Sequence, residues 1–363
     1  MTQQLQETVK RLISQIVDPY TDQDLLAGGA LQGVGIDGSK VAVDIVLGYP
    51  AKSVADELAQ RVRDVLQADA AIEKATVGVS WRVRAHTVQK DLTPLPNVKN
   101  ILAVASGKGG VGKSTTSANL ALALQAEGAK VGLLDADIYG PSIPRMMGVS
   151  GKPDSRDGKH IEPKLAHGVQ TMSIGFLIEE DTPMIWRGPM VTQALTQLLN
   201  ETNWVDLDYL IIDLPPGTGD IQLTLCQKVP VSGALIVTTP QDIALLDAKK
   251  ALKMFEKVEV PVLGIVENMA LHTCSRCGHS EHIFGSGGGE RMAQQYGVPL
   301  LGSLPLDIRI REQADGGTPT VAADPHGALA QAYAEIARKA AAQLSLRARS
   351  KSIQFPKIVI QNT

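Results

Sequence analysis

Cysteine, long apolar runs and an excess of charge of either sign are all scarce in this sequence. Three cysteines among 363 residues are too few for a disulfide framework, which favours a reducing compartment. No apolar stretch approaches the roughly 18 to 20 uncharged residues that a membrane helix needs. The first residues, MTQQLQETVKR, lack the apolar core of a signal peptide. We therefore expect a cytoplasmic protein with no membrane partner.

The charges of the chain nearly cancel. Lysine and arginine number 35 against 38 aspartates and glutamates, which leaves a net charge of −3. A surface so close to neutral predicts no nucleic-acid partner and no anionic membrane surface as a partner. The length leaves room for two domains and a sizeable core.

Residues 105–116 read ASGKGGVGKSTT and contain the complete phosphate-loop pattern, GxxxxGKS. The apolar run at 101–105 predicts a buried strand before the loop, and 117–127 predicts a helix after it. Glycines let backbone N–H groups surround the phosphates of ATP, while Lys113 would neutralise the β- and γ-phosphates and Ser114 would ligate Mg²⁺. The expected nucleotide-binding residues of the loop are Gly107, Lys108, Gly109, Gly110, Val111, Gly112, Lys113, Ser114 and Thr115.

A second lysine, Lys108, directly follows the first glycine of the loop. An ordinary phosphate loop does not need it, because Lys113 already supplies the charge beside the phosphates. The form KGGxGKST resembles the deviant Walker A class of dimeric ATPases. In that class the extra lysine reaches across the dimer interface to the partner's nucleotide, so the resemblance implies a catalytic Lys108 and an ATP-stabilised homodimer. An exposed loop lysine is the alternative.

Two strand ends deliver carboxylates to the expected nucleotide site. The run VGLLDAD ends with Asp135 and Asp137, and DYLIID matches the Walker B pattern and ends with Asp213. Carboxyl ends of parallel strands line the ligand crevice, so these side chains should face the nucleotide, with Asp213 beside Mg²⁺. In the resembling class the second aspartate of the first pair orients the attacking water. That implies Asp137 as the catalytic base and Asp135 as support for the magnesium shell; a cap on the following helix is the alternative for one of them.

Two further positions complete the expected nucleotide site. Gly217, in the segment LPPGTGD after Asp213, has an N–H that can meet the γ-phosphate and begins a loop suited to distinguishing ATP from ADP. Asn268 ends a late apolar strand, and its amide has the donor and acceptor needed to read an adenine edge. The resemblance supports that role for Asn268, and a turn-capping asparagine is the alternative.

Residues 1–86 form the first expected unit, a small α/β domain. Apolar residues at helical spacing predict a helix that runs through Val17 and ends at Asp18-Pro19, and a second helix begins with Ser53 as its cap and runs to Leu66. Strands are expected at 41–47 and 75–84.

The second expected unit, 98–345, is a P-loop NTPase domain with a mainly parallel sheet flanked by helices. A proline-containing linker at 87–97 precedes it, and a tail at 346–363 follows, whose basic run is expected to be solvated rather than a membrane anchor. Cys226 lies in an apolar helical segment and is expected in the core. Strands are expected at 100–105, 130–135, 169–174, 208–213, 233–238, 262–267 and 299–303.

A polar stretch, HTCSRCGHSEH, holds the Cys-x-x-Cys pair Cys274 and Cys277. Two thiolates cannot complete the four-ligand shell of zinc or of an iron–sulfur cluster, but two chains related by a two-fold axis supply four. Because Lys108 independently predicts a dimer, a metal site shared between two chains is the favoured interpretation. The open alternatives are a zinc site within one chain that adds His279 and His282, a redox dithiol, and two inert cysteines.

Together these motifs resemble the Mrp/ApbC iron–sulfur cluster carrier ATPases. The likeness rests on the deviant Walker A loop, on DADIYGP, on DLPPGTGD and on the cysteine pair after ENM, and it covers roughly residues 98–345. Residues 1–86 resemble the metal–sulfur-cluster-assembly domain that often precedes the ATPase in bacterial members; relatives sometimes carry a cysteine there, and this chain has none.

The resemblance to these carriers implies cofactors and partners. It implies ATP, Mg²⁺ and slow ATP hydrolysis in a homodimer. It also implies a labile [4Fe–4S] cluster held between Cys274 and Cys277 of two protomers. The cluster would be received from an assembly scaffold and passed to apo iron–sulfur proteins.

Two other functional classes share the nucleotide motifs. One is a switch of the ParA/MinD kind, whose output is binding to DNA, membrane or a protein partner. The cysteine pair, the missing basic face and the missing amphipathic tail separate the present sequence from it. The other is a reductase resembling the nitrogenase iron protein, which draws single cysteines from separated parts of each chain rather than from a tight Cys-x-x-Cys pair.

Overall fold

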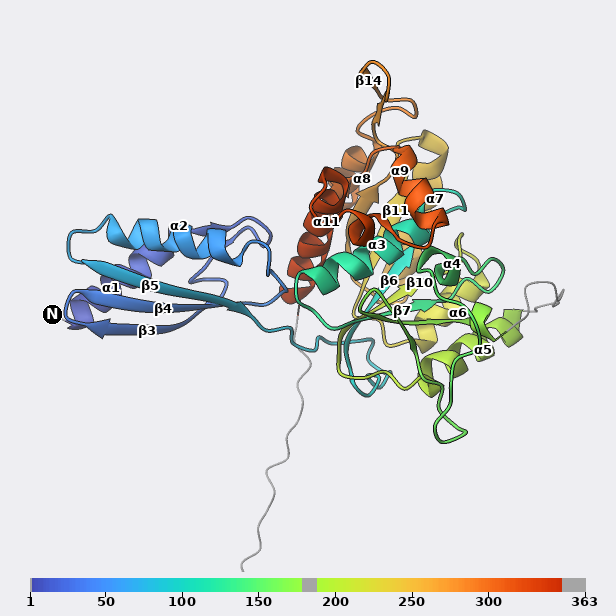
Figure 1. Cartoon of the computed structure of the whole chain (residues 1–363), viewed down its shortest axis with the longest axis horizontal. Helices are drawn as coiled ribbons and strands as arrows, with labels where there is room; N and C mark the ends of the chain where they lie inside the picture. Colours follow the sequence, from blue (N-terminus) through green and yellow to red (C-terminus); the bar gives the residue numbers. More distant parts are fainter. Residues whose placement is uncertain (1, 178–187, 348–363) are drawn as a thin grey trace, which may run out of the picture.

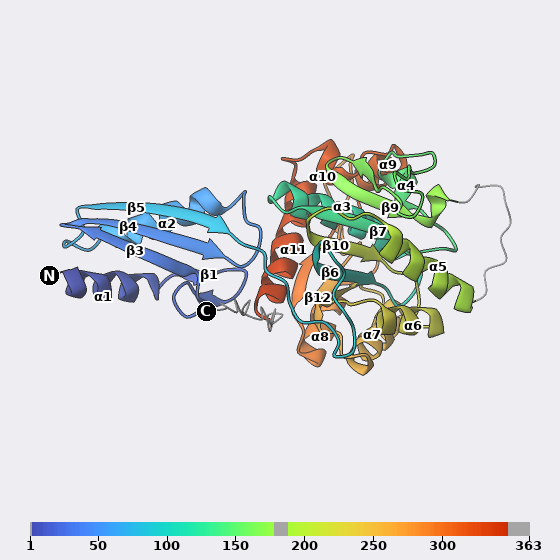
Figure 2. The same ribbon diagram turned by 90° about the horizontal axis from the view of Figure 1, so that it is seen from below.

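The computed structural model describes residues 2–177 and 188–347. Figures 1 and 2 show a smaller N-terminal body beside a larger one, with the last described helix, α11 (Ala328–Ser345), on the side of the larger body that faces the smaller. The expectation of a solvated basic tail falls almost wholly on positions 348–363, outside the described residues. Over the part of the chain that is described, no helix is both long enough and apolar enough to cross a bilayer.

A three-stranded sheet with two helices on one face makes up the smaller body. Its strand order is β3-β4-β5, with the first pair antiparallel and the second parallel. Burial alternates along β4, as expected for a sheet with one covered face, and its inward residues are Val41, Val43, Ile45 and Leu47. The elements are α1 (Thr2–Ile13), β1 (Val17–Asp18), β2 (Gln23–Asp24), β3 (Leu31–Asp37), β4 (Lys40–Leu47), α2 (Ala55–Gln67) and β5 (Lys74–Trp81).

The smaller body corrects three details of the sequence prediction. Helix α1 ends at Ile13 rather than at Asp18, because the chain turns there and pairs β1 with β2. The N-cap of helix α2 is Val54, which forms no side-chain hydrogen bond. The prediction that Ser53 caps this helix is therefore wrong. Strand β5 ends at Trp81, three residues earlier than expected. The hairpin β3–β4 was not predicted, although its Asp37-Gly38 turn is a recognised hairpin signal.

An eight-stranded sheet forms the centre of the larger body and confirms the expected α/β architecture. Its order is β15-β12-β11-β6-β10-β7-β9-β8, and every pair is parallel except β8–β9. The strands are β6 (Val98–Ala105), β7 (Val131–Asp135), β8 (Lys164–Ala166), β9 (Val169–Ser173), β10 (Leu207–Asp213), β11 (Gly233–Thr238), β12 (Val262–Glu267) and β15 (Leu300–Ser303).

Helices cover both faces of this sheet and enclose two apolar cores. Along β6, Leu102 and Val104 enter the core under α3 and α11, whereas Ile101 and Ala103 enter the core under α5, α6 and α7. The predicted core position of Cys226 is confirmed in the second core. The remaining elements are α3 (Lys113–Ala126), α4 (Ile143–Met146), a 3₁₀ turn (Ile174–Phe176), α5 (Gly188–Glu201), α6 (Asp220–Lys228), α7 (Asp242–Lys257), β13 (His272–Thr273), β14 (Ser280–Glu281), α8 (Gly288–Tyr296), α9 (Ile308–Asp315) and α10 (Thr320–Ala323).

The two bodies meet around a buried ion pair of the larger body, between Glu127, which caps the C-terminus of α3, and Arg338 of α11. From the smaller body, Ser53 donates its backbone N–H (2.9 Å) and its hydroxyl (2.6 Å) to the Glu127 carboxylate, and its Oγ accepts from Arg338 at 2.9 Å. The Tyr20 hydroxyl accepts from Arg338 Nε at 2.8 Å, and the guanidinium lies 5.1 Å from the centre of the Tyr20 ring. We call Tyr20, Ser53, Glu127 and Arg338 the junction network. Ser53, expected to cap a helix, instead joins the two bodies.

Breaking the ion pair from one side should destabilise the protein strongly. Arg338→Met leaves Glu127, only 2% exposed, without its counter-charge. We expect a loss of about 3 kcal/mol in the free energy of unfolding, measured by urea denaturation. The double variant Glu127→Gln/Arg338→Met should recover at least half of that loss. Arg309→Met, which breaks a pair with Asp307 at the surface, is the matched control and should cost less than about 1 kcal/mol; equal costs for the two single variants would contradict the assignment.

Candidate nucleotide-binding and thiol site

The phosphate loop joins the end of β6 to the start of α3, as the sequence predicts, although α3 begins at Lys113 rather than at Ser117. Two of its glycines are required by the local geometry. Gly112 has φ of +84°, and a Cβ there would lie 2.1 Å from Nδ2 of Asn268. A Cβ on Gly107 would lie 2.1 Å from the backbone carbonyl carbon of Asp247 in α7. The loop is therefore packed tightly between α7 and the end of β12, and only glycine fits at these two positions.

Three predicted residues come together at the start of α3. Lys113 Nζ lies 2.8 Å from Asp213 Oδ1, and the Ser114 hydroxyl donates to Asp213 Oδ2 at 2.6 Å. The sequence prediction missed Ser117, whose hydroxyl donates to Asp213 Oδ1 at 2.7 Å. Its spacing of one helical turn from Ser114 was the available signal, because residues three apart share a helix face. The fully buried Asp213 carboxylate thus receives one cation and two hydroxyls.

The oxygens of this cluster suit Mg²⁺. Magnesium prefers oxygen ligands and is usually held by one or two carboxylates together with substrate phosphates. Ser114 Oγ and Asp213 Oδ2 are neighbours at the mouth of the loop, and no nitrogen or sulfur ligand is needed. The donor set therefore fits the magnesium site that the sequence predicts.

Asp135 and Asp137 lie in different surroundings. Asp135 pairs in register with Asp213 across β7 and β10, and its carboxylate accepts hydrogen bonds from the backbone N–H of Asp137 and Ile143 and from the Ser173 hydroxyl. Burial, with the nearby Asp213 charge as the second cause, raises the pKa of Asp135 to about 7. The bond to Ile143 at the start of α4 is the capping role that the sequence left as an alternative.

The carboxylate of Asp137 is only partly buried. Burial raises its pKa above the usual value, the Asp213 charge raises it further, and Lys113 opposes the shift. Asp137 is therefore near both the lysine of the phosphate loop and the Walker B carboxylate. A carboxylate in this position with a raised pKa is a better proton acceptor than an exposed one.

Three other predicted nucleotide residues lie around the loop. Gly217 has a φ of +101°, and its N–H donates to the carbonyl of Ser106 at 3.0 Å. The segment 214–219 therefore contacts the phosphate loop. Asn268 donates from Nδ2 to the Val111 carbonyl at 2.9 Å and accepts at Oδ1 from its neighbour's N–H. Lys108 is half-buried and forms no ion pair with a described carboxylate. The adenine-reading role of Asn268 remains a prediction.

The cysteine pair lies at the tip of the hairpin β13–β14, which projects from the larger body on the side of α8 and α9 (Figure 1). Backbone bonds close the tip, from the Cys274 N–H to the His279 carbonyl and from the Gly278 N–H to the Cys274 carbonyl. Cys277 is exposed and Cys274 partly so. Within residues 2–177 and 188–347, no group of three or more histidine, cysteine or acidic side chains is arranged to hold a metal ion. The tip brings two thiols together but not the two histidines of the one-chain zinc alternative.

The thiols differ in acidity for physical reasons. Hydrogen bonds from the backbone N–H groups of Cys277 and Arg276, then from the Cys277 thiol, lower the pKa of Cys274. Burial raises the pKa of Cys226 to about 12. Thiolates are the ligands that metals bind, so the hairpin favours metal binding at Cys274 and the core disfavours it at Cys226.

Replacing Gly112 by alanine should damage nucleotide binding. An alanine there would have to adopt a left-handed backbone conformation, and its Cβ would clash with Asn268. We expect this strain to cost about 1–3 kcal/mol. We expect the affinity for ADP to fall by about tenfold or more, measured with a fluorescent nucleotide analogue. Gly35→Ala in β3, where the new Cβ would make an ordinary 3.7 Å contact with Ala42, is the control. Unchanged affinity in Gly112→Ala would show that the loop does not hold the phosphates.

Alkylation should separate the cysteines by their surroundings. In the native protein at pH 7, iodoacetamide should modify Cys274 and leave Cys226 intact, because the lowered pKa of Cys274 gives more thiolate at that pH. Mass spectrometry of timed samples gives the two rates. In urea both cysteines should react, which controls for the chemistry of the reagent. Comparable native rates would contradict the difference in burial and pKa between the two cysteines.

Comparisons with known proteins agree with this geometry. Residues 97–341 match the ParA family model described as NUBPL iron-transfer P-loop NTPase, and residues 6–79 match the model described as iron–sulfur cluster assembly protein. The chain is 52% identical over 345 residues to the iron–sulfur cluster carrier protein of Haemophilus influenzae, covering 95% of this chain and 93% of that protein. It is 51% identical over 253 residues to the mouse iron–sulfur cluster transfer protein NUBPL, covering 69% and 79% of the two chains.

Solved structures support the fold of the larger body. A nucleotide-binding protein from Archaeoglobus fulgidus in complex with ADP is 41% identical, with a TM-score of 0.55 over 61% of this chain and 87% of that one. The cell division ATPase MinD of Pyrococcus furiosus is 26% identical, with a TM-score of 0.50 over 66% and 97%. Both are similar to this chain over its P-loop NTPase part.

Proposed function

Because the chain belongs to the family of NUBPL-type iron-transfer P-loop NTPases, the iron–sulfur cluster carriers, we propose that it carries a cluster on its Cys274–Cys277 hairpin under the control of ATP. The observation that supports this most directly is the pair of neighbouring, accessible thiols on a projecting hairpin, one of them with a lowered pKa. The cargo is a [4Fe–4S] cluster, taken from an assembly scaffold and passed to apo iron–sulfur proteins.

Each protomer offers two thiolates to a cluster that needs four ligands. A second copy related by a two-fold axis would supply the other two, so the carrier is a homodimer with the cluster at its axis. An exposed site with two ligands from each chain releases its cargo readily, because opening the dimer removes half of the ligands at once.

The nucleotide site would bind ATP with Mg²⁺ and hydrolyse it slowly. Lys113 would neutralise phosphate charge, and Ser114 and Asp213 would hold Mg²⁺, which when bound would supply further charge neutralisation to the phosphates. Asp137, partly buried and with a raised pKa, accepts the proton of the attacking water. Lys108 reaches the nucleotide of the partner protomer and stabilises charge in the transition state. Asp135 positions the chain between β7 and α4.

The proposed division of the chain is the one that the sequence predicts. Residues 1–86 form the cluster-assembly-like domain, 87–97 the linker, 98–345 the ATPase domain and 346–363 a tail. The smaller body does not ligate the cluster, because none of the three cysteines lies in it. The protein acts in the cytoplasm, with neither nucleic acid nor membrane as a partner.

Anaerobic reconstitution with iron and sulfide tests the proposal. We expect about two irons and two sulfides per chain, an absorbance band at about 400 nm and the mass of a dimer, as one four-iron cluster per two chains requires. Cys274→Ala/Cys277→Ala should lose all metal and fail to activate an apo-enzyme, while Cys226→Ala should behave as the unsubstituted protein. A dimer that holds zinc alone, or no metal, would instead indicate an ATP-dependent switch whose output is partner binding.

A further inference from the structure

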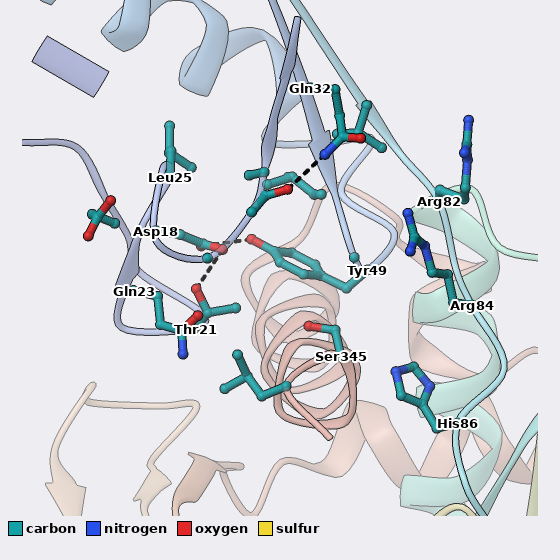
Figure 3. A pocket seen from close by; sticks show the side chains of 18 residues that line it. Asp18, Thr21, Gln23, Leu25, Gln32, Tyr49, Arg82, Arg84, His86 and Ser345 are labelled. Carbon is teal, nitrogen blue, oxygen red and sulfur yellow. Dashed lines mark hydrogen bonds between the residues drawn. The ribbon is translucent and has the colours of Figure 1, made fainter. Parts of the chain in front are cut away.

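A second pocket lies away from the nucleotide and thiol sites, where the two bodies meet (Figure 3). It encloses about 70 Å³ and is lined by the loop 18–25, the end of β4, the extended segment 82–86 and the last residues of α11. The backbone after β4 lies close to the end of α11, since a Cβ on Gly48 would lie 2.9 Å from Cβ of Ser345. We call this space the junction pocket.

The acidic groups of the junction pocket already have hydrogen-bond donors. Asp18, 5% exposed, accepts from the Tyr49 hydroxyl at 2.7 Å, from the Thr21 hydroxyl at 3.0 Å and from the Tyr20 N–H at 3.0 Å. Burial and the charge of Asp18 raise the pKa of Tyr49, so its hydroxyl stays protonated and keeps donating. Asp24 accepts from two backbone N–H groups of the next turn. Both carboxylates are thus hydrogen-bonded within the smaller body.

The two arginines of the pocket have no such partners among the described residues. Arg82 and Arg84 follow β5 on an extended segment, and both line the pocket, as expected for residues two apart. In Figure 3 they lie along the wall opposite Asp18. Among the described residues, neither guanidinium has an ion pair or hydrogen bond to a carboxylate or carbonyl. Both side chains are exposed, so the pocket is lined by two solvent-accessible arginines and by acids that are already hydrogen-bonded.

The backbone that carries these arginines is fixed. The Arg82 N–H donates to the Leu47 carbonyl at 2.9 Å, and the Arg84 carbonyl accepts from Asn100 Nδ2 at 2.9 Å. The Asn100 Oδ1 in turn accepts from the His86 N–H and lies 3.0 Å from His86 Nδ1. A fixed backbone lowers the entropy that the guanidinium groups lose on binding a ligand.

We propose that the junction pocket binds a small oxyanion, a phosphate or carboxylate group, between Arg82 and Arg84. Guanidinium groups match such anions through paired, charge-assisted hydrogen bonds, and a volume of about 70 Å³ is enough for one such group. The site is independent of the cluster proposal, since it involves neither the cysteines nor the phosphate loop. Because its walls come from both bodies, the bound anion also strengthens their docking beside the junction network.

The full-length protein labelled with [¹⁵N]arginine provides a direct test. Inorganic phosphate and citrate are titrated separately at constant ionic strength with the nucleotide site saturated by MgADP, and the side-chain Nε–H signals are followed by NMR. We expect the Arg82 and Arg84 signals to shift with saturation and the Arg63 signal on α2 to stay unchanged. Tighter binding of phosphate points to a phosphorylated ligand, and tighter binding of citrate points to a carboxylate.

Variants of the pocket complete the experiment. Arg84→Met should weaken binding of the tighter probe by about tenfold, the value of one charge-assisted hydrogen bond, and Arg84→Lys should weaken it less. Arg63→Met is the control for the loss of one exposed positive charge and should leave the affinity unchanged. The proposal is overturned if neither probe shifts the Arg82 and Arg84 signals in saturable fashion, or if Arg84→Met and Arg63→Met bind equally well.

Discussion

The buried carboxylate of Asp213 is the group on which the larger body depends. It ties the end of β10 to the first turn of α3 through Lys113, Ser114 and Ser117, which supply a cation and two hydroxyl donors. A buried charge is tolerated only when its oxygens are satisfied in this way. At the other end of the helix, the C-cap residue Glu127 forms a second buried ion pair with Arg338 of α11, and the Ser53 hydroxyl of the smaller body donates to the Glu127 carboxylate. Helix α3 is therefore held at both ends by buried charges.

The parts of the fold that could be predicted are those that local pattern determines. The strands of the parallel sheet are continuous apolar runs, and the phosphate loop is a contiguous motif, so both were located to within a few residues. What failed depends on contacts between distant residues. Ser53 resembles a helix cap in sequence, but the carboxylate of Glu127, 74 positions away, takes its hydrogen bonds. Likewise α1 ends early because the chain turns to pair Val17 with Asp24, which the helical spacing of its apolar residues does not reveal.

The candidate site shows the same division. The position of Asp135 and Asp137 at a strand end predicts that both face the nucleotide, but it does not show which of them has a structural role. The structure shows that they differ in burial and in hydrogen-bond partners. The carboxylate of Asp135 accepts hydrogen bonds from the Ile143 N–H and the Ser173 hydroxyl, whereas Asp137 remains partly accessible near Lys113. Asn268 is a similar case, because its amide holds the Val111 carbonyl and so supports the phosphate loop. Such roles depend on which atoms a side chain meets, and no spacing rule encodes that.

The thiol hairpin combines two physical requirements that conflict in most metal sites. A ligand must be a thiolate to bind iron, which calls for a lowered pKa, yet a carrier must give the cluster up, which calls for exposure and few ligands. Cys274 meets the first requirement through backbone N–H groups of its own turn rather than through a buried cationic neighbour. The hairpin can therefore project into solvent without losing that stabilisation. Because the pKa of Cys274 is lowered mainly by hydrogen bonds of the turn itself, that lowering would not depend on the second copy of the hairpin that the proposed shared site requires.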